Sequence, residues 1–433
     1  MKVRILLTEV LGERSFRRQY LARAVSAFGT AMAPIGLSFA ILDRGGSAAD
    51  LGVVLTAGSI AMITLLLFAG VWADKYPRNR LMALADLVRV VSQGALAAAI
   101  LAGWTNLWFI AATQVVSGAA SGLFSPASSG LTVLTAKPSR LQESNSLLST
   151  TNTALAAVGP LVAAVLIGTV GPGWCLAADA ASFALSALFC SGIVLRPRPA
   201  RQDGDAAEPG FLTELRQGWT EVSTRSWIWS TILACAAWQV LYSSFVVLGP
   251  AVAKQSFGGA GGWAAVLTAV SIGSALGGLL GFVWKPRRPM LVSTAVQVGL
   301  VPMVLLVAVR APLVLVLLTA LLAGIAQTYP DLLWKLTLQQ HVPEEAMSRV
   351  SSYDWLGSVA MNPLSFVLAA ALSSTFGVVT TLTGAAVMLV VVTALVLLVP
   401  SIRTIRRIET EEPTEEPTED RAPGVPEPAG QSA

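Results

Sequence analysis

About twelve segments of the sequence are each long and apolar enough to cross a lipid bilayer. A helix needs about 20 mostly apolar residues to span roughly 30 Å of hydrocarbon. The connections between the segments are short, except at 196–226. The segments run approximately over residues 20–42, 50–73, 81–102, 105–125, 145–168, 174–195, 227–252, 263–284, 290–309, 312–334, 351–374 and 378–400. The sequence therefore predicts an all-α integral membrane protein with about twelve transmembrane helices.

Charged residues are too few to cover a water-soluble surface. They make up 12% of the 433 residues, and apolar residues make up 54%, whereas soluble domains are about a quarter charged. This disfavours a soluble enzyme, a nucleic-acid-binding protein and a disordered chain, and it leaves the lipid bilayer as the main solvent. The single His341 excludes a histidine-based metal cluster, and the three cysteines form no CxxC pair. We expect no metal and no cofactor.

The Lys and Arg residues predict how the chain lies in the membrane. Of the 29, 25 fall in one alternating set of loops and termini, and Arg89 falls inside a segment. The other set holds only Arg44, Lys254 and Arg310. Because cytoplasmic loops carry the excess of basic residues, both termini are predicted to be cytoplasmic, in a multi-pass protein of the cell membrane.

Recurring features divide the chain into two halves. Gly70 and Gly281, Pro138 and Pro343, and Pro160 and Pro363 are separated by 203–211 residues. We expect a six-helix bundle at 1–195, a cytoplasmic loop at 196–226, a second six-helix bundle at 227–402 and a disordered cytoplasmic tail at 403–433. Two parallel repeats with a binding site between them are one transporter architecture.

Several short motifs resemble one transporter family. The stretch Gly70-Val-Trp-Ala-Asp74-Lys75-Tyr-Pro-Arg78-Asn-Arg80 resembles the loop between helices two and three of the major facilitator superfamily, although Pro77 replaces a common Gly. Asp86-Leu-Val-Arg89, the stretch from Trp174 to Phe183, and His341-Val-Pro343 with Arg349-Val350 are similar to the bacterial branch of macrolide efflux pumps and the enterobactin exporter. The resemblance covers roughly residues 15–400 and implies the major facilitator fold and alternating access.

The resemblance also implies gating residues at the cytoplasmic end of the second helix. In that family the acid, here Asp74, helps hold the cytoplasmic gate of the outward-facing state, and Gly70, Lys75, Arg78 and Arg80 belong to the same motif. The alternative is that the three basic residues only anchor the topology. Contacts that exist in one of two conformations bias the equilibrium between them.

Charged residues inside the apolar segments are candidates for ion coupling, because charges in a membrane are costly and are usually paired or functional. Asp86 and Arg89 are three residues apart, and Asp331 and Lys335 are four apart, so each pair can meet on a helix face. Asp179 has no cation nearby in the sequence, and Asp354 lies one turn into segment eleven. For Asp86 and Asp331 the alternative to proton coupling is a structural ion pair. For Asp179 it is a bond to a neighbouring helix, and for Asp354 it is a role at the helix start or in the gate.

Gly159 and Pro160 in segment five resemble a reduced form of an antiporter motif of that family, with Ala163-Ala164 where a glycine pair is usual. Asn145, Ser149, Asn152, Ala156 and Gly159 share one helix face. Such a face also suits close packing between helices in lipid.

The family's cavity is lined mainly by helices one, four, seven and ten, which implies a set of candidate substrate contacts. A few polar groups and aromatic rings in an apolar wall suit an amphipathic organic ligand. The candidates on those segments are Ser26, Thr30, Gln114, Trp238, Gln239, Tyr242, Gln327 and Tyr329.

These features predict a secondary-active exporter of a hydrophobic or amphipathic small molecule, coupled by proton antiport. No lysine lies in the GxxxxGK[ST] context that binds nucleotide phosphates. The alternatives are an exporter dedicated to one siderophore or metabolite, an importer, and a transport-inactive membrane sensor. We expect a monomer, no nucleic-acid partner and no enzymatic activity.

Overall fold

The computed structural model describes residues 9–104, 106–194, 222–342, 350 and 360–408. Within these ranges the ordered elements are helices, and no strand is found. The side chains of Gly70, Val71 and residues 73–75 near the end of one helix lie outside the description, as do a few on the fourth long helix. The predicted 403–433 tail and 196–226 loop fall largely outside the described residues.

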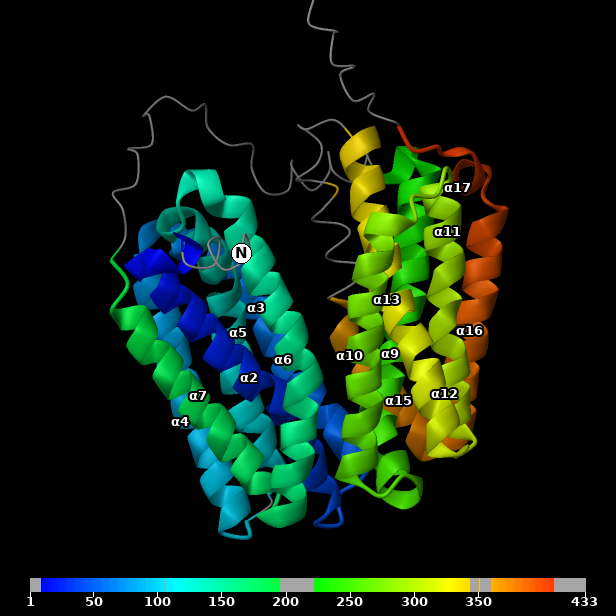
Figure 1. The fold of residues 1–433 in the computed structure, drawn as a ribbon. Helices are drawn as coiled ribbons and strands as arrows, with labels where there is room; N and C mark the ends of the chain where they lie inside the picture. The colour runs from blue at the N-terminus through cyan, green and yellow to red at the C-terminus, as the bar shows by residue number, and fades with distance from the viewer. Residues whose placement is uncertain (1–8, 105, 195–221, 343–349, 351–359, 409–433) are drawn as a thin grey trace, which may run out of the picture.

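The first half of the chain forms six long helices. They are α2 (Arg14–Leu42), α3 (Ala48–Lys75), α4 (Arg78–Leu101), α5 (Leu107–Thr135), α6 (Leu141–Thr169) and α7 (Pro172–Ser191), with the 3-10 turn η1 (Pro138–Arg140) before α6. A Ser47–Asp50 capping box begins α3, and Asn106 caps α5. Figure 1 shows these helices as one group of roughly parallel rods.

The second half forms a similar group beside the first (Figure 1). It contains α9 (Ser226–Ser256), α10 (Ala260–Val283), α13 (Leu313–His341), α15 (Met361–Phe376), α16 (Val378–Leu398) and the short α17 (Pro400–Thr404). Between α10 and α13, one span is divided into α11 (Pro289–Val296), the 3-10 turn η2 (Gln297–Leu300) and α12 (Val301–Ala308). The division of the chain into two folding units stays a prediction.

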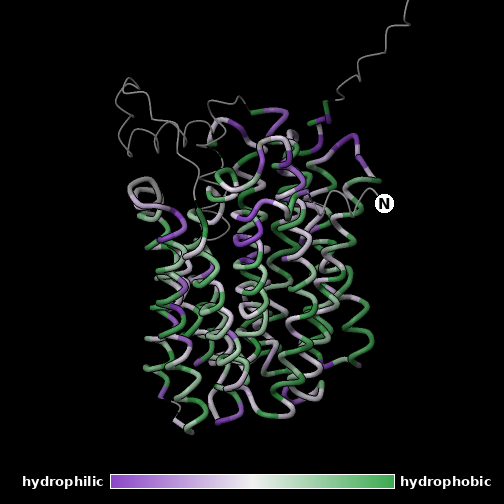
Figure 2. The backbone as a smooth tube through the Cα atoms, turned by 60° about the vertical axis from the view of Figure 1, so that its left-hand side comes forward, coloured by the Kyte–Doolittle hydropathy of each residue, from purple (hydrophilic) through white to green (hydrophobic). Residues whose placement is uncertain are grey.

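The prediction of an all-α membrane protein is confirmed. Eleven helices of the described chain are long and apolar enough to cross a membrane, with α11 to α12 counted as one, and α15 is a shorter apolar helix. Segment eleven was expected at 351–374; its described helical part is Met361–Phe376, and residues 351–359 lie outside the described residues. Figure 2 shows hydrophobic residues along the rods and hydrophilic ones mainly at one end.

Glycines set how closely two helix pairs approach. A Cβ added at Gly118 on α5 would overlap the carbonyl of Gly58 on α3, and one at Gly122 would overlap that of Met62. In the second half, Gly273 of α10 lies similarly against Leu321 of α13. Since lipid supplies no hydrophobic force between helices, such close packing is a main source of their association.

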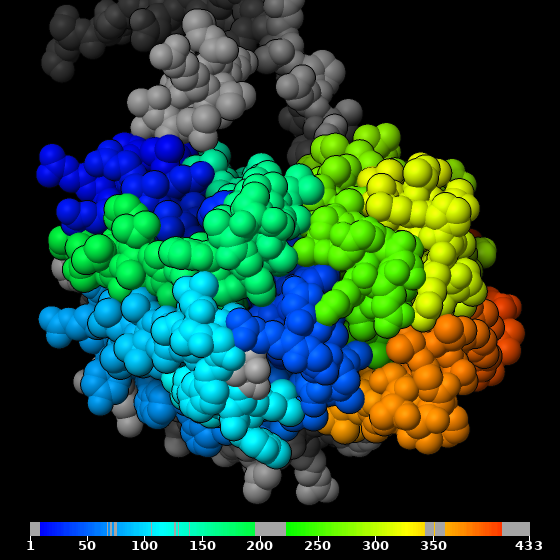
Figure 3. All heavy atoms as spheres, turned by 90° about the horizontal axis from the view of Figure 1, so that it is seen from below, coloured from blue at the N-terminus to red at the C-terminus, as the bar shows by residue number. Residues whose placement is uncertain are grey.

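The two halves contact each other near one end of the bundle, the end that carries Arg44, Lys254 and Arg310. We call it the opposite end, because most of the other basic residues lie at the other end. Lys254 Nζ, at the end of α9, lies 3.0 Å from Asp43 Oδ1 at the end of α2. Gly52 of α3 packs against Phe366 and Ala370 of α15. Figure 3 views this end, where atoms of the two halves meet directly. The other end, which carries the α3–α4 turn and α17, is the basic end.

Each basic residue at the opposite end has a local partner. Arg44 donates to the carbonyl of Ile100 at 2.9 Å, and Arg310 donates to Gln255 Oε1 at 2.9 Å. Of the three, Lys254 has its partners, Asp43 and the Leu42 carbonyl, in the other half of the chain. The three exceptions to the basic-residue pattern therefore all make contacts at this end, and the contact of Lys254 joins the two halves.

We predict that Gly118→Ala destabilises the protein by about 1–3 kcal/mol, because the added methyl group overlaps the α3 backbone. The matched control is Gly94→Ala, since an added Cβ at Gly94 of α4 meets nothing within 4 Å and alanine favours a helix. Thermal melting in one detergent measures both. A melting temperature for Gly118→Ala equal to that of Gly94→Ala would contradict the packing account.

Candidate functional site

A buried charge cluster lies inside the first half, between α4 and α7. Asp86 and Arg89 of α4 are an ion pair, with Oδ1 and the guanidinium 3.4 Å apart. Ser186 of α7 donates a hydrogen bond of 2.6 Å to the other oxygen of Asp86. Arg89 is only 5% exposed and Asp86 is fully buried. The expected ion pair within α4 is therefore present, and Ser186 of a second helix, α7, donates a further hydrogen bond to it.

Two aromatic rings lie against the Arg89 guanidinium. Its central carbon lies 4.7 Å from the ring centre of Phe124 on α5 and 4.9 Å from that of Phe183 on α7. A cation over an aromatic face gains electrostatic attraction, about 2 kcal/mol when it is removed from water. The guanidinium is thus fixed by three helices.

Asp179 of α7 belongs to the same cluster. It had no cation nearby in the sequence, but the fold brings Arg89 of α4 within electrostatic reach of its carboxylate. The side chain is 1% exposed, and its Oδ1 has no hydrogen-bond partner among the described residues. That oxygen faces Gly29 of α2, where an added Cβ would press against it. Two carboxyl groups therefore share one guanidinium.

The other acidic candidates have different surroundings. Asp331 and Lys335 form the expected pair, 2.7 Å apart, with side chains 50% and 63% exposed. An exposed pair of this kind contributes about 1 kcal/mol at most. Asp354 lies outside the described residues. Among the described candidates, the buried, incompletely paired carboxylate is that of Asp179.

The gate motif lies at the turn from α3 to α4. Gly70, Asp74 and Lys75 are in the last turns of α3, and their side chains lie outside the description. Arg80 is exposed in the first turn of α4. The guanidinium of Arg78 lies over Gly130 of α5, where any Cβ would overlap it. No motif in the sequence indicated that Gly130 leaves room for the Arg78 guanidinium.

The Gly159-Pro160 motif lies within α6, at its contact with two other helices. Pro160 lacks an N–H, so the carbonyl of Ala156, four residues earlier, has no helical donor. Ser271 of α10 donates to that carbonyl at 3.1 Å, and Thr268 donates to the Ala157 carbonyl at 3.0 Å. Gly159 lies against Ala31 of α2. The motif thus provides a hydrogen-bond acceptor between the two halves.

A cavity of about 580 Å³ lies in the first half and includes two of the predicted substrate contacts, Ser26 and Thr30. The third candidate there, Gln114, is not among its lining residues and packs against Gly58. The cavity also exposes the edge of the charge cluster. Its lining is Arg23, Ser26, Ala27, Thr30, Ala31, Met62, Arg89, Ser121, Phe124, Ser128, Asn152 and Ala156.

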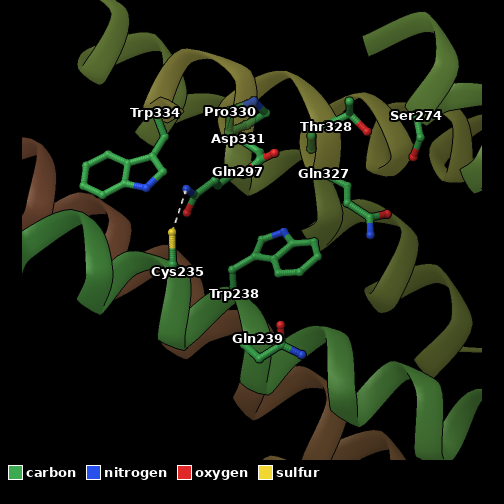
Figure 4. A pocket seen from close by; sticks show the side chains of 11 residues that line it. Cys235, Trp238, Gln239, Ser274, Gln297, Gln327, Thr328, Pro330, Asp331 and Trp334 are labelled. Carbon is green, nitrogen blue, oxygen red and sulfur yellow. Dashed lines mark hydrogen bonds between the residues drawn. The ribbon is translucent and has the colours of Figure 1, made fainter. Parts of the chain in front are cut away.

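A second cavity, of about 420 Å³, lies in the second half and includes the candidates Trp238, Gln239 and Gln327 (Figure 4). Tyr242 stacks on Trp238 with ring centres 4.9 Å apart and shares a hydrogen bond with Gln327. Residues that the sequence did not single out for the cavity are Cys235, Ser274, Gln297, Ala326, Thr328, Pro330 and Trp334, together with Asp331. They come from α9, α10, η2 and α13.

Tyr329 does not line this cavity. Its side chain is fully buried, stacks on Trp284 and donates a 2.8 Å hydrogen bond to the Trp284 carbonyl. Gln239, by contrast, also bonds Asn362 and so joins α9 to α15. A position on the tenth predicted span, which is α13 in the structure, was therefore insufficient to predict a cavity contact.

The two cavities adjoin the same contact between the halves. Ala156 of α6 lines the first cavity and accepts the bond from Ser271 of α10. Ser274, one turn further along α10, lines the second cavity. The described residues contain no group of three or more His, Cys, Asp or Glu side chains that could hold a metal ion. Both cavities therefore border the α6–α10 contact.

We predict that Arg89→Met destabilises the protein by about 3–5 kcal/mol, because it leaves two buried carboxyl groups without their cation. Arg80→Met is the matched control on the same helix, at an exposed position, and should cost less than about 1 kcal/mol. Thermal melting in detergent compares the two variants. Equal stability would show that the cluster is not a structural necessity.

Comparisons with known proteins identify the family. Residues 20–354 match the model of the Major Facilitator Superfamily. The multidrug efflux pump Tap of Mycolicibacterium fortuitum is 23% identical over 402 residues, which cover 89% of this chain and 95% of Tap.

Two solved structures share the fold. The nucleoside transporter NupG has a TM-score of 0.70 at 13% identity, and the match covers 88% of this chain and 98% of the NupG chain. A bacterial homolog of the human lysosomal transporter Spinster, inward-facing and occupied, has a TM-score of 0.69 at 14% identity and covers 89% and 96%. Because the family match extends over most of the sequence, this chain belongs to the Major Facilitator Superfamily and is a multi-pass membrane transporter, not an enzyme.

Proposed function

We propose that the protein exports a hydrophobic or amphipathic small organic molecule across the cell membrane by alternating access, with proton antiport. The observation that carries this proposal is the pair of cavities beside the α6–α10 contact, with walls that are mainly aromatic, apolar or neutral and polar. Such walls suit a drug-like or natural-product ligand. The similarity to the multidrug efflux pump Tap supports export.

The contacts between the halves support alternating access. At the opposite end, the Asp43–Lys254 pair and the packing of Gly52 on α15 join the halves. We propose that these contacts form in the inward-facing state and break when the protein opens outward. The motif of Gly70, Asp74, Lys75, Arg78 and Arg80 would then hold the basic end closed. With both termini cytoplasmic, the basic end faces the cytoplasm.

The buried cluster is our candidate for proton coupling. Asp86, Asp179 and Arg89 carry one more negative than positive charge when both acids are ionised, and a single proton removes that excess. Since an uncompensated charge is costly in a membrane, a change in access to Asp179 can drive proton binding or release. Asp331 is exposed and has its own cation, so it is a weaker candidate.

We predict that reversing the charge in Asp43→Lys weakens the closed opposite end and shifts the protein away from the inward-facing state. Cys235 lines a cavity, whereas Cys175 and Cys190 are buried, so maleimide labelling of Cys235 from the basic end reports this state. Because an exposed ion pair contributes about 1 kcal/mol at most, its loss can lower the population of the inward-facing state about two- to fivefold. We expect the labelling rate to decrease by the same factor.

The charge swap Asp43→Lys with Lys254→Asp should restore the labelling rate. Arg310→Gln is the control, because Arg310 bonds Gln255 within its own half. If Arg310→Gln changes the rate as much as Asp43→Lys, the ion pair is not a contact specific to one state.

We predict that Asp179→Asn abolishes efflux driven by a pH gradient but leaves downhill movement of substrate, because the variant cannot exchange a proton at the cluster. Purified protein in liposomes with the dye Hoechst 33342 measures both modes, and we expect at least a tenfold loss of the driven rate. Glu143→Gln is the control, because Glu143 lines neither cavity and forms a surface ion pair with Arg140, and this variant should retain driven efflux. Driven efflux at the wild-type rate in Asp179→Asn would refute this assignment.

A further inference from the structure

We propose that Gln297, Trp334 and Trp238 form a recognition site for the amide-type edge of a flat, neutral ligand, in which an N–H donor adjoins a carbonyl acceptor. This inference rests on the proposed function, since it assigns a substrate class to the cavity of the second half. It adds a specific hydrogen-bonding site to a cavity otherwise described by its aromatic and neutral polar walls.

Three polar atoms at this cavity have no hydrogen-bond partner among the described residues. They are Oε1 of Gln297 and the indole Nε1 of Trp238 and of Trp334, and each atom is buried. Gln297 is 5% exposed and Trp334 is 4% exposed. A buried polar atom without a partner is unfavourable, so an unoccupied site of this kind favours a ligand that satisfies it.

The three residues come from three elements and all line this cavity. Trp238 lies on α9, Gln297 begins η2 and Trp334 lies on α13. Figure 4 shows the Trp334 indole nitrogen and the Gln297 amide next to each other near Cys235, whereas the Trp238 nitrogen lies on the side of its ring away from Cys235. The Gln297 amide makes only a long contact of 3.8 Å from Nε2 to the Cys235 sulfur.

Neighbouring rings fix the two donors. Trp334 packs edge-on against Trp227 with ring centres 5.6 Å apart. Trp238 is stacked on Tyr242, almost parallel at 11°. Because both indoles are held by packing, their N–H groups are preorganised, and ordering them on binding costs little. The Trp238 ring also provides a flat face for a planar ligand.

The composition of the site selects the ligand chemistry. The two indoles only donate, whereas Gln297 Oε1 only accepts, so the complementary ligand must offer both an acceptor and a donor. Asp331 is the charged residue of the described lining, and Lys335 already pairs with it at 2.7 Å. A cationic ligand would therefore compete with Lys335 for this carboxylate. A lactam or carboxamide edge on a flat ring fits, and about 420 Å³ has room for a bicyclic molecule.

A pair of small probes tests the inference in the full-length protein in lipid nanodiscs. 2-Quinolone is flat and neutral and has a lactam N–H beside its carbonyl, whereas 1-methyl-2-quinolone lacks only that donor. Saturation-transfer NMR titrations, with empty nanodiscs as a blank, give both affinities. We expect 2-quinolone to bind on the order of tenfold more tightly, because the N-methyl probe leaves Gln297 Oε1 without a partner.

Two variants should remove this preference. Gln297→Leu should bind both probes equally, and Trp334→Phe should weaken 2-quinolone on the order of tenfold through loss of one donor. The matched controls are Gln255→Leu at the opposite end and Trp229→Phe, whose ring is 44% exposed on α9. Both controls should bind the two probes as the wild type does.

Equal affinity of the wild type for the two probes, no binding of 2-quinolone, or an unchanged preference in Gln297→Leu would each overturn the inference. Driven efflux of Hoechst 33342 is scored separately. If the dye is exported but the lactam preference is absent, this site is wrong and the proposed function stands. If the preference is present but no gradient drives efflux, the site stands and the proposed function fails.

Discussion

The need to compensate one guanidinium inside a membrane protein determines much of this structure. Arg89 lies within the first half and is only 5% exposed, so its charge needs partners inside the protein. Asp86 forms an ion pair with Arg89, and Ser186 donates a hydrogen bond to Asp86. The rings of Phe124 and Phe183 pack against the guanidinium. These contacts fix α4, α5 and α7 around one point. Asp179 then adds a second carboxylate, so the cluster has an excess of one negative charge when both acids are ionised.

The same constraint separates structural from functional polar groups in the rest of the bundle. Most polar side chains at membrane depth bond a backbone carbonyl, as Ser271 does with the carbonyl that Pro160 leaves free. Among the side chains with unpaired buried atoms, three line the cavity of the second half: Trp238, Gln297 and Trp334. In our account, a substrate satisfies these atoms, while a proton balances the charge cluster. We propose that the two events occur in different halves and are coupled by the contacts between them.

Much of the fold could be predicted from the sequence, because length and apolarity alone determine which segments can cross a bilayer. The Asp86–Arg89 and Asp331–Lys335 pairs were also predictable, since helical spacing brings residues three or four apart together. Contacts between distant helices were not. Asp179 was predicted without its cation because Arg89 lies on another helix, and Tyr329 was expected in a cavity but points to Trp284. Gln297 was missed because a 3-10 turn, not a motif, brings it to the cavity.

Infrared difference spectroscopy of the purified protein during a pH titration tests the central claim, that the buried cluster holds an exchangeable proton. We expect a protonated-carboxyl band in the wild type that is lost in Asp179→Asn and retained in Asp331→Asn, and whose intensity changes when substrate binds. A wild-type protein without such a band, or a band unaffected by Asp179→Asn, would contradict it.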